Sequence, residues 1–372
     1  MIIDFENITY LRLLLGVEGI GPQKILNLLT KFDNLKSILD SPIVRLMQVE
    51  GISNKLAYRI HNCRKSLGDS TEILKIEIDR LEKLNAKIIT YWDSDYPEIL
   101  KKIFYPPLII YVLGNLNFRD NTSVSVVGTR QPSTYGKNMA EFFSRELVNK
   151  NLTIISGLAR GIDSIAHETA LKSGGRTIAV IGSGIDIIYP PENKKLFEKI
   201  KENGAVISEF ELGTKPDAQN FPRRNRIISG MSLGTLVIET RLTGGAMQTA
   251  AYALDQNREI FAVPGNINIK QSEGPNSLIQ RGEAKLVMCA DDILQELNLR
   301  PEKSSSAYKP IPNFELNLFE GKILNSLSSE PQYIDELAAA TALNTSDCLI
   351  NLLTLEFKGL VKQMPGKMFI RL

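Results

Sequence analysis

The sequence predicts an α/β protein with a doubly wound parallel sheet, a small helical domain before it and a winged-helix domain after it. Six short apolar runs alternate with helical segments in the middle of the chain, a glycine-containing phrase occurs twice near the start, and three helical segments precede two strands at the end. Short apolar runs separated by helices are typical of parallel strands that are buried on both faces.

The composition sets limits on the possible functions. A chain of 372 residues, 43% hydrophobic and 23% charged, has the make-up of a globular protein. Its net charge of only +2 means that nucleic-acid binding requires basic residues gathered in one place. The three cysteines form no CxxC pair, which argues against a disulfide framework and against a zinc site.

The expected location is the cytoplasm. The first residues, "MIIDFENITY", are acidic where a signal peptide is basic, and no apolar run approaches the roughly 18 residues of a membrane span. We therefore expect no membrane association.

Residues 1–80 are predicted to form the helical domain. The phrases "LLGVEGIGPQKILNLL" (14–29) and "LMQVEGISNKLAYRI" (46–60) both place Val-Glu-Gly-Ile before an amphipathic helix. A glycine hairpin between two helices leaves backbone N–H groups exposed at a helix N-terminus, which is a site for an anion. The pattern resembles the helix-hairpin-helix or SAM-like modules of DNA-binding proteins. The alternative is that the glycines only form tight turns in a scaffold.

Residues 85–299 are predicted to form the extended Rossmann-like domain. The expected strands are "KIITYW" and, in the repeating part, "VSVVG" (124–128), "TIISG" (153–157), "TIAVIG" (177–182), "AVISE" (205–209), "TLVIE" (235–239) and "IFAVPG" (260–265). Open sheets of this kind bind ligands beyond the carboxyl ends of their strands.

The last part of the chain is predicted to be a linker, residues 300–313, and a winged-helix domain, residues 314–372. The linker is rich in Pro, Ser and Lys. The winged-helix domain has five basic and seven acidic residues, so a role in protein contact or regulation is favoured over phosphate binding.

Enzyme motifs are incomplete, and we predict no catalytic residues, no metal site and no cofactor. The phrase "GMSLG" fits GxSxG, but a helical stretch precedes Ser232 and a strand follows it, the reverse of a nucleophile elbow. Asp163 and His167 lie four apart on one helix, where a capping and packing role is favoured over a relay. The phrase "GSGID" lacks the third glycine of a dinucleotide-binding loop.

Cations follow four successive predicted strands. Arg130 follows the first, Arg160 the second, Lys194 and Lys195 the third, and the phrase "FPRRNR" with Arg223, Arg224 and Arg226 the fourth. Because parallel strands end at one edge of a sheet, these side chains are expected to line one groove there. The alternative is that they are solvated charges on the covering helices.

The groove is predicted to bind single-stranded nucleic acid without sequence preference. Gly128 and Gly157 allow a ligand to approach the backbone closely, and Phe221 offers a face for base stacking. Arginine side chains both pair with phosphates and stack on bases. The candidate site is Gly128, Arg130, Ser156, Gly157, Arg160, Lys194, Lys195, Phe221, Arg223, Arg224, Asn225 and Arg226.

The phrases "VVGTRQPSTYG", "SGLARGIDSIAH", "VIGSGIDIIYPPENKKL", "ISEFELGTKPDAQNFPRRNRIISGMS" and "IFAVPGNI" with "EGPNSLIQRGEAKLV" resemble, in order, the motif series of the DprA/Smf family of bacterial DNA-processing proteins. The resemblance covers residues 85–298 and implies a dimer that binds single-stranded DNA, protects strands taken up in natural transformation and passes them to the RecA recombinase. It implies DNA contacts at Arg130, at Lys194, and at Phe221 with the three arginines that follow it.

One phrase departs from that family. "TRLTGGAMQTA" (240–250) stands where members carry a serine-rich "SGSLITA"-type phrase, so contacts made by those hydroxyls are in doubt. It also resembles the PGGxGTxxE phrase of nucleotide phosphoribohydrolases, the alternative function. Ala251 and Tyr252 occupy the region where that chemistry needs a glutamate. A nucleotide-processing enzyme is therefore disfavoured.

Overall fold

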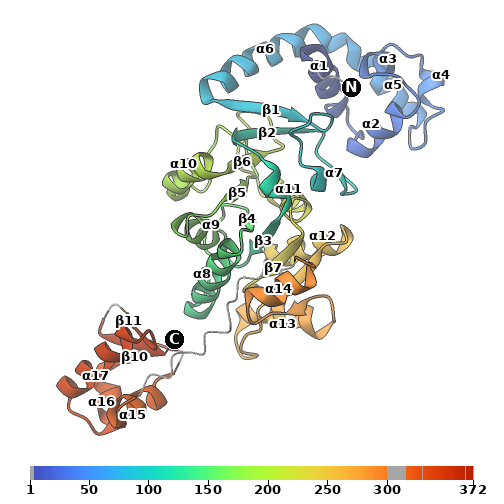
Figure 1. Cartoon of the computed structure of the whole chain (residues 1–372). Coiled ribbons are helices and arrows are strands. Elements are labelled where there is room, and N and C mark those ends of the chain that lie inside the picture. The colour runs from blue at the N-terminus through green and yellow to red at the C-terminus, as the bar shows by residue number, and fades with distance from the viewer. Residues whose placement is uncertain (1–3, 300–315, 329, 365, 372) are drawn as a thin grey trace. The chain divides into compact units, whose positions relative to one another are not determined.

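The computed structural model describes residues 4–299, 316–328, 330–364 and 366–371. The chain divides into two compact units, one ending at Arg300 and the other starting at Pro301 (Figure 1). The predicted linker, residues 300–313, lies outside the described residues.

Nine strands of the first unit form one mixed sheet in the order β1-β2-β6-β5-β4-β3-β7-β8-β9. Strands β3 to β9 run parallel to one another, whereas β2 is antiparallel to both β6 and β1. The bounds are β1 Ala86–Thr90, β2 Ile109–Gly114, β3 Ser123–Val127, β4 Thr153–Ser156, β5 Thr177–Val180, β6 Ala205–Ser208, β7 Gly234–Val237, β8 Glu259–Ala262 and β9 Lys285–Leu286. The predicted strands are confirmed, and β1 and β2 extend the sheet.

Helices cover both faces of the sheet, as the continuous apolar strands require. Val124 and Val126 of β3 pack with α8 and α9, while Val127, one residue on, packs with α11 and α12 on the opposite face. The bounds are α7 Glu98–Lys101, α8 Thr134–Asn149, α9 Ile162–Lys172, α10 Lys194–Asn203, α11 Asn220–Gly230, α12 Gly245–Asp255, α13 Glu273–Gln280 and α14 Ala290–Glu296. The doubly wound architecture predicted from the sequence is confirmed.

The strand order reverses at β3. The chain proceeds from β3 through β4 and β5 to β6 on one side, then returns to place β7 on the other side of β3. Such a reversal opens a crevice beyond the carboxyl ends of the two strands, because the loops that follow them leave toward opposite faces.

The N-terminal helices carry the two glycine hairpins. They are α1 Phe5–Leu15, α2 Pro22–Leu29, α3 Leu35–Leu39, α4 Ile43–Leu46, α5 Asn54–Cys63 and α6 Leu67–Leu84. Gly19 and Gly51, at equivalent places in the repeated phrase, have φ of 93° and 79°, which is why glycine stands there. The repeat therefore produces two equivalent turns before α2 and α5.

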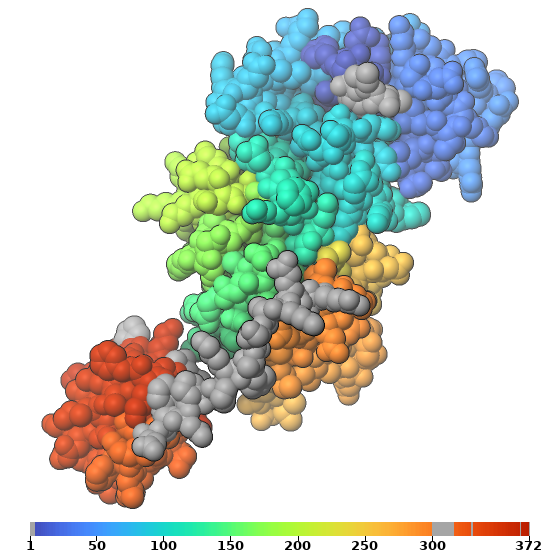
Figure 2. All heavy atoms as spheres, in the orientation of Figure 1, coloured from blue at the N-terminus to red at the C-terminus, as the bar shows by residue number. Residues whose placement is uncertain are grey.

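These helices share a hydrophobic core with the sheet. Leu14 of α1 belongs to the same buried cluster as Tyr111 of β2 and Val206 of β6, and in Figure 2 the blue atoms of the N-terminal part lie directly against the cyan and green atoms that follow them in the chain. Arg12 of α1 also pairs with the buried Glu77 of α6. Helix α6 continues past the predicted boundary at residue 80.

The second unit has the helices and strands of a winged helix. Its elements are α15 Leu318–Ser326, β10 Gln332–Tyr333, α16 Ile334–Thr341, α17 Thr345–Phe357, β11 Val361–Met364 and β12 Met368–Arg371. The strands pair in the order β10-β12-β11 around a core that includes Ile323, Leu352 and Phe369. The predicted winged helix is confirmed, with the short strand β10 in addition.

Candidate functional site

An open pocket of about 710 Å³ lies at the carboxyl ends of β3 and β7. Residues 127–130 after β3 form one wall, residues 240–249 after β7 form another, and the start of α11 forms a third. A smaller pocket adjoins it between the loops after β4 and β5, and Arg130, Phe221 and Arg224 line both. We call the two pockets together the groove.

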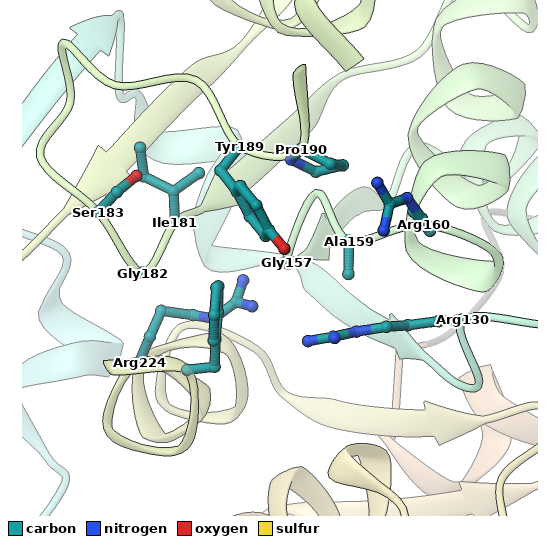
Figure 3. Close-up of a pocket in the computed structure, with 11 residues that line it drawn as sticks. Arg130, Gly157, Ala159, Arg160, Ile181, Gly182, Ser183, Tyr189, Pro190 and Arg224 are labelled. Carbon is teal, nitrogen blue, oxygen red and sulfur yellow. The ribbon is translucent and has the colours of Figure 1, made fainter. Parts of the chain in front are cut away.

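An aromatic pair and an arginine stack in the groove. The ring centroids of Tyr189 and Phe221 are 5.7 Å apart. The Arg130 guanidinium carbon lies 5.6 Å from the Phe221 ring centroid, a cation–π distance. In Figure 3, Tyr189 and Arg130 reach into the same space from different loops. The groove therefore offers aromatic faces beside a positive charge.

Arg224 is the most buried cation of the groove, with 4% of its surface exposed. Its Nη1 donates to the carbonyl oxygen of Val180, and its Nε has no hydrogen-bond partner among the described atoms. A Cβ on Gly157 would lie 2.1 Å from that Nη1. Gly157 thus leaves the room that the guanidinium occupies, and Figure 3 shows the Arg224 head turned to the space that Arg130 enters.

A buried acid and a buried histidine lie behind Arg224. The Asp163 carboxylate accepts the backbone N–H groups of Gly157 at 3.1 Å and Ala159 at 3.4 Å. Burial lowers the pKa of Arg224 to about 10, and the charge of Asp163 opposes that shift. Burial, then the charge of Arg224, lowers the pKa of His167 to about 3, and its Nδ1 lies 2.6 Å from the Thr177 hydroxyl.

Arg160 lines the smaller pocket but is paired with an acid. Its Nε contacts the carboxylate of Glu192, and both side chains are about half exposed. The hydrogen bond raises the pKa of Arg160 and lowers that of Glu192. Because both side chains are about half exposed, solvent weakens this pair, and Arg160 remains part of the pocket wall.

The other predicted cations do not converge on the groove. Arg226 pairs with Glu209, and neither side chain is more than 14% exposed. Arg223 is exposed and stacks on Phe210, its guanidinium carbon 5.5 Å from the ring centroid. Lys194 and Lys195 are exposed on the first turn of α10 and do not line the groove. The expectation that all seven cations share one groove is therefore corrected.

The helical spacing of "FPRRNR" explains this outcome. Successive residues of an α-helix point about 100° apart, so Arg223, Arg224 and Arg226 of α11 face different directions. Of the three, only Arg224 lines the groove.

The uncharged candidates divide between the groove and the sheet below it. Gly128 and Gly157 line the groove. Asn225 lines it while its amide donates to the Gly245 carbonyl at 3.4 Å. Ser156 is buried below, and its hydroxyl donates to the Val126 carbonyl oxygen at 2.7 Å. Ser156 is therefore a supporting residue of the sheet.

Three residues of this region were not among the predicted site residues. Tyr189 follows the turn after β5, and Arg241 is an exposed cation of the groove after β7. Arg241 follows the predicted strand "TLVIE", and this position could have added it to the cations that follow the other predicted strands. Glu239 is buried at the end of β7 and accepts from the Ser133 backbone N–H at 2.9 Å, which holds the start of α8.

Ser232 is buried, and its hydroxyl donates to the backbone oxygens of Ile228 and Ser229. It lies between α11 and β7, the order that the sequence indicated. Within the described residues, no cluster of three or more His, Cys, Asp or Glu side chains is placed to hold a metal ion. No helix in the described parts of the chain is long and apolar enough to cross a membrane.

Three family models match the chain in separate regions. The model described as DNA recombination-mediator protein A matches residues 87–298. The DprA winged helix domain matches residues 309–367, and a SAM-like helix-hairpin-helix tandem matches residues 11–65. The helical module predicted from the glycine hairpins thus has a match of its own.

Relatives and solved structures agree with these matches. A protein of Synechocystis named Smf is 34% identical over 389 aligned residues, which cover 95% of this chain and 96% of that protein. The X-ray structure of DNA processing protein A from Streptococcus pneumoniae has a TM-score of 0.65 and 33% identity, covering 80% of this chain and 99% of that one. A DprA structure from Helicobacter pylori, whose title describes a single-stranded DNA binding mode, has a TM-score of 0.52 and 29% identity, covering 58% of this chain and 96% of that one.

Proposed function

Because the chain belongs to the DprA/Smf family of DNA recombination-mediator proteins, we propose that it binds single-stranded DNA without sequence preference in the groove between β3 and β7. The observation that carries the proposal is the convergence of Arg130 and Arg224 beside the Tyr189 and Phe221 rings. Cations pair with phosphates of any sequence, and aromatic faces stack on any base.

The groove favours single strands over duplexes. Stacking on Phe221 and Tyr189 requires bases that are not already stacked on both sides, which a duplex does not offer. The described site has charge and aromatic faces but no element shaped to enter a major groove, which is how most proteins read duplex sequence. Affinity for duplex DNA is expected to be lower for this reason.

In the cell, the proposed role is that of a non-enzymatic mediator. The protein would act in the cytoplasm as a homodimer that protects single strands taken up in natural transformation and loads RecA onto them. Family membership supports these steps, and the groove supports the DNA-binding part.

Salt dependence of binding to a labelled oligonucleotide tests the proposal. Three groove arginines, Arg130, Arg224 and Arg241, are in no salt bridge among the described residues. If each neutralises one phosphate, log K falls against log salt with a slope of about −2, from roughly −0.7 per phosphate. A slope near zero would contradict phosphate binding in the groove.

Matched variants locate the site. Arg130→Ala and Arg224→Ala should weaken binding by a similar factor for oligo-dT, oligo-dA and mixed sequences, since phosphates carry no sequence. Ser232→Ala is the control, because its hydroxyl is buried away from the groove. Losses that depend on sequence would indicate base readout instead.

A further inference from the structure

Arg224 is a buried cation, and few of its N–H groups donate a hydrogen bond to another described residue. Of its five N–H donors, one is taken by the Val180 carbonyl oxygen, and Nε has no partner among the described atoms. Burying a charge in this way costs free energy unless an opposite charge or further hydrogen bonds compensate it. The fold must therefore contain something that keeps this guanidinium in place.

Asp163 is the group placed to do so. It lies in the first turn of α9, and its carboxylate accepts from the backbone N–H groups of Gly157 and Ala159. Those two residues form the turn after β4 against which the Arg224 guanidinium packs. Asp163 thus fixes the turn that the Arg224 guanidinium packs against, although its carboxylate makes no direct hydrogen bond to Arg224 among the described residues.

The surrounding charges leave Asp163 as the compensating group. Arg130, from the loop after β3, repels Arg224, while the charge of Asp163 favours the charged form of Arg224. His167 of α9 is neutral near pH 7, because burial and the charge of Arg224 lower its pKa to about 3. No hydrogen bond or ion pair joins Asp163 to Arg224 among the described residues. Burial raises the pKa of Asp163, and the charge of Arg224 and the N–H groups of Ala159 and Gly157 oppose that rise.

We infer that Asp163 is a positioning residue for DNA binding: it holds the turn of residues 157–160 and stabilises the charged Arg224 head toward the groove. The inference rests on the proposed function, since it gives Asp163 a role in the same site. Its structural alternative is that Asp163 only stabilises the start of α9, as acids in a first helical turn do.

A double-mutant cycle separates the two roles. Asp163→Asn retains an oxygen that accepts from Gly157 but removes the charge, and Arg224→Gln removes the guanidinium. Affinity for a labelled oligo-dT is measured for wild type, both single variants and the double variant. We expect Asp163→Asn to weaken binding about tenfold and to add little in the Arg224→Gln background, with a salt slope reduced by about 0.7 in Asp163→Asn.

A second acidic residue of α9 supplies the control for this experiment. Glu168→Gln makes the same charge change at an exposed site on α9 and should leave affinity and slope unchanged. If Asp163→Asn costs as much with Arg224→Gln as without it, the inference is wrong while the proposed site stands. If Arg224→Gln alone has no effect, the proposed site is wrong. Should Asp163→Asn fail to fold, Asp163→Ser, which leaves a capping hydroxyl, replaces it in the cycle.

Discussion

Arg226 donates to the carboxylate of Glu209, and the two side chains are only 14% and 9% exposed. One turn of α11 therefore directs one arginine to the groove and another to an internal ion pair. The contact joins Arg226 Nη2 to Glu209 Oε2, while the buried Arg226 Nη1 and Glu209 Oε1 have no hydrogen-bond partner among the described atoms. Each charged group therefore depends on this one contact. The pair therefore stabilises the fold, although Arg226 belongs to the phrase "FPRRNR" that was predicted to bind DNA.

Glu209→Gln is expected to destabilise the fold without weakening DNA binding by the folded protein. Removing one partner of a buried ion pair leaves the other charge uncompensated, at a cost of about 3 kcal/mol in the free energy of unfolding. Urea unfolding measures the cost. Glu198→Gln, which breaks the half-exposed Glu198–Lys201 pair, is the control and should cost less than about 1 kcal/mol. A tenfold loss of affinity in folded Glu209→Gln would contradict this role.

Gly157→Ala is expected to weaken single-strand binding about tenfold. Its Cβ would overlap the Arg224 guanidinium, which must move away from the groove. Losing one charge-assisted hydrogen bond costs about 1.5 kcal/mol, close to a factor of ten in Kd. Fluorescence anisotropy measures the change. Gly68→Ala, where a Cβ meets no atom within 4 Å, should bind as the wild type does. Unchanged affinity in Gly157→Ala would show that Arg224 is not a DNA contact.

Glu192→Gln is expected to strengthen binding about threefold at low salt, an effect of the size that exposed ion pairs show. The substitution releases Arg160, which lines the smaller pocket, and removes a negative charge that repels phosphates. Comparison with Glu198→Gln, an equal charge change on α10 in a residue that does not line the groove, separates a local effect from a general one. Equal gains in both variants would assign the effect to net charge alone.

His167 is expected to make the fold sensitive to acid. Its pKa is lowered from 6.5 to about 3 in the folded chain, so between these values the unfolded chain binds a proton that the folded chain does not. Stability from this residue is therefore complete above pH 6.5 and falls as the pH decreases, by about 3 kcal/mol at pH 4.

Urea unfolding at several pH values tests the prediction for His167. The slope of stability against pH between 7 and 4 should be shallower in His167→Gln. The exposed His61, the other histidine of the chain, supplies the control, and His61→Gln should retain the wild-type slope. An identical slope in wild type and His167→Gln would show that His167 titrates normally.

Local patterns were sufficient to predict the strands and the two flanking modules. The strand "VSVVG" and its five counterparts are mostly apolar on both faces, with buried serines and threonines among them, because a parallel sheet is buried on both faces. The two hairpins were recognisable because Gly19 and Gly51 adopt a positive φ that other residues avoid. Each of these features depends on interactions within a few residues.

The groove was predicted only in part. Arg130 follows a strand directly, and its position at the sheet edge follows from the strand alone. Lys194 and Lys195 lie many residues beyond β5, and the intervening loop carries them onto the outer surface of α10. Arg224 lies 16 residues beyond the end of β6 and still lines the groove, because helix α11 turns it back toward the strands. Sequence distance alone therefore does not decide which cations reach the groove.

The sequence by itself determined the order of strands and helices, the two hairpins and the presence of cations after the strands, because backbone preferences and hydrophobic periodicity act over short distances. Only the tertiary structure decided which cations face the groove and which are neutralised. Glu209 and Glu192 are distant in sequence from the arginines they hold, and so is Asp163 from Arg224. The strength of an electrostatic interaction depends on distance in space and on burial, and both exist only once the chain has folded.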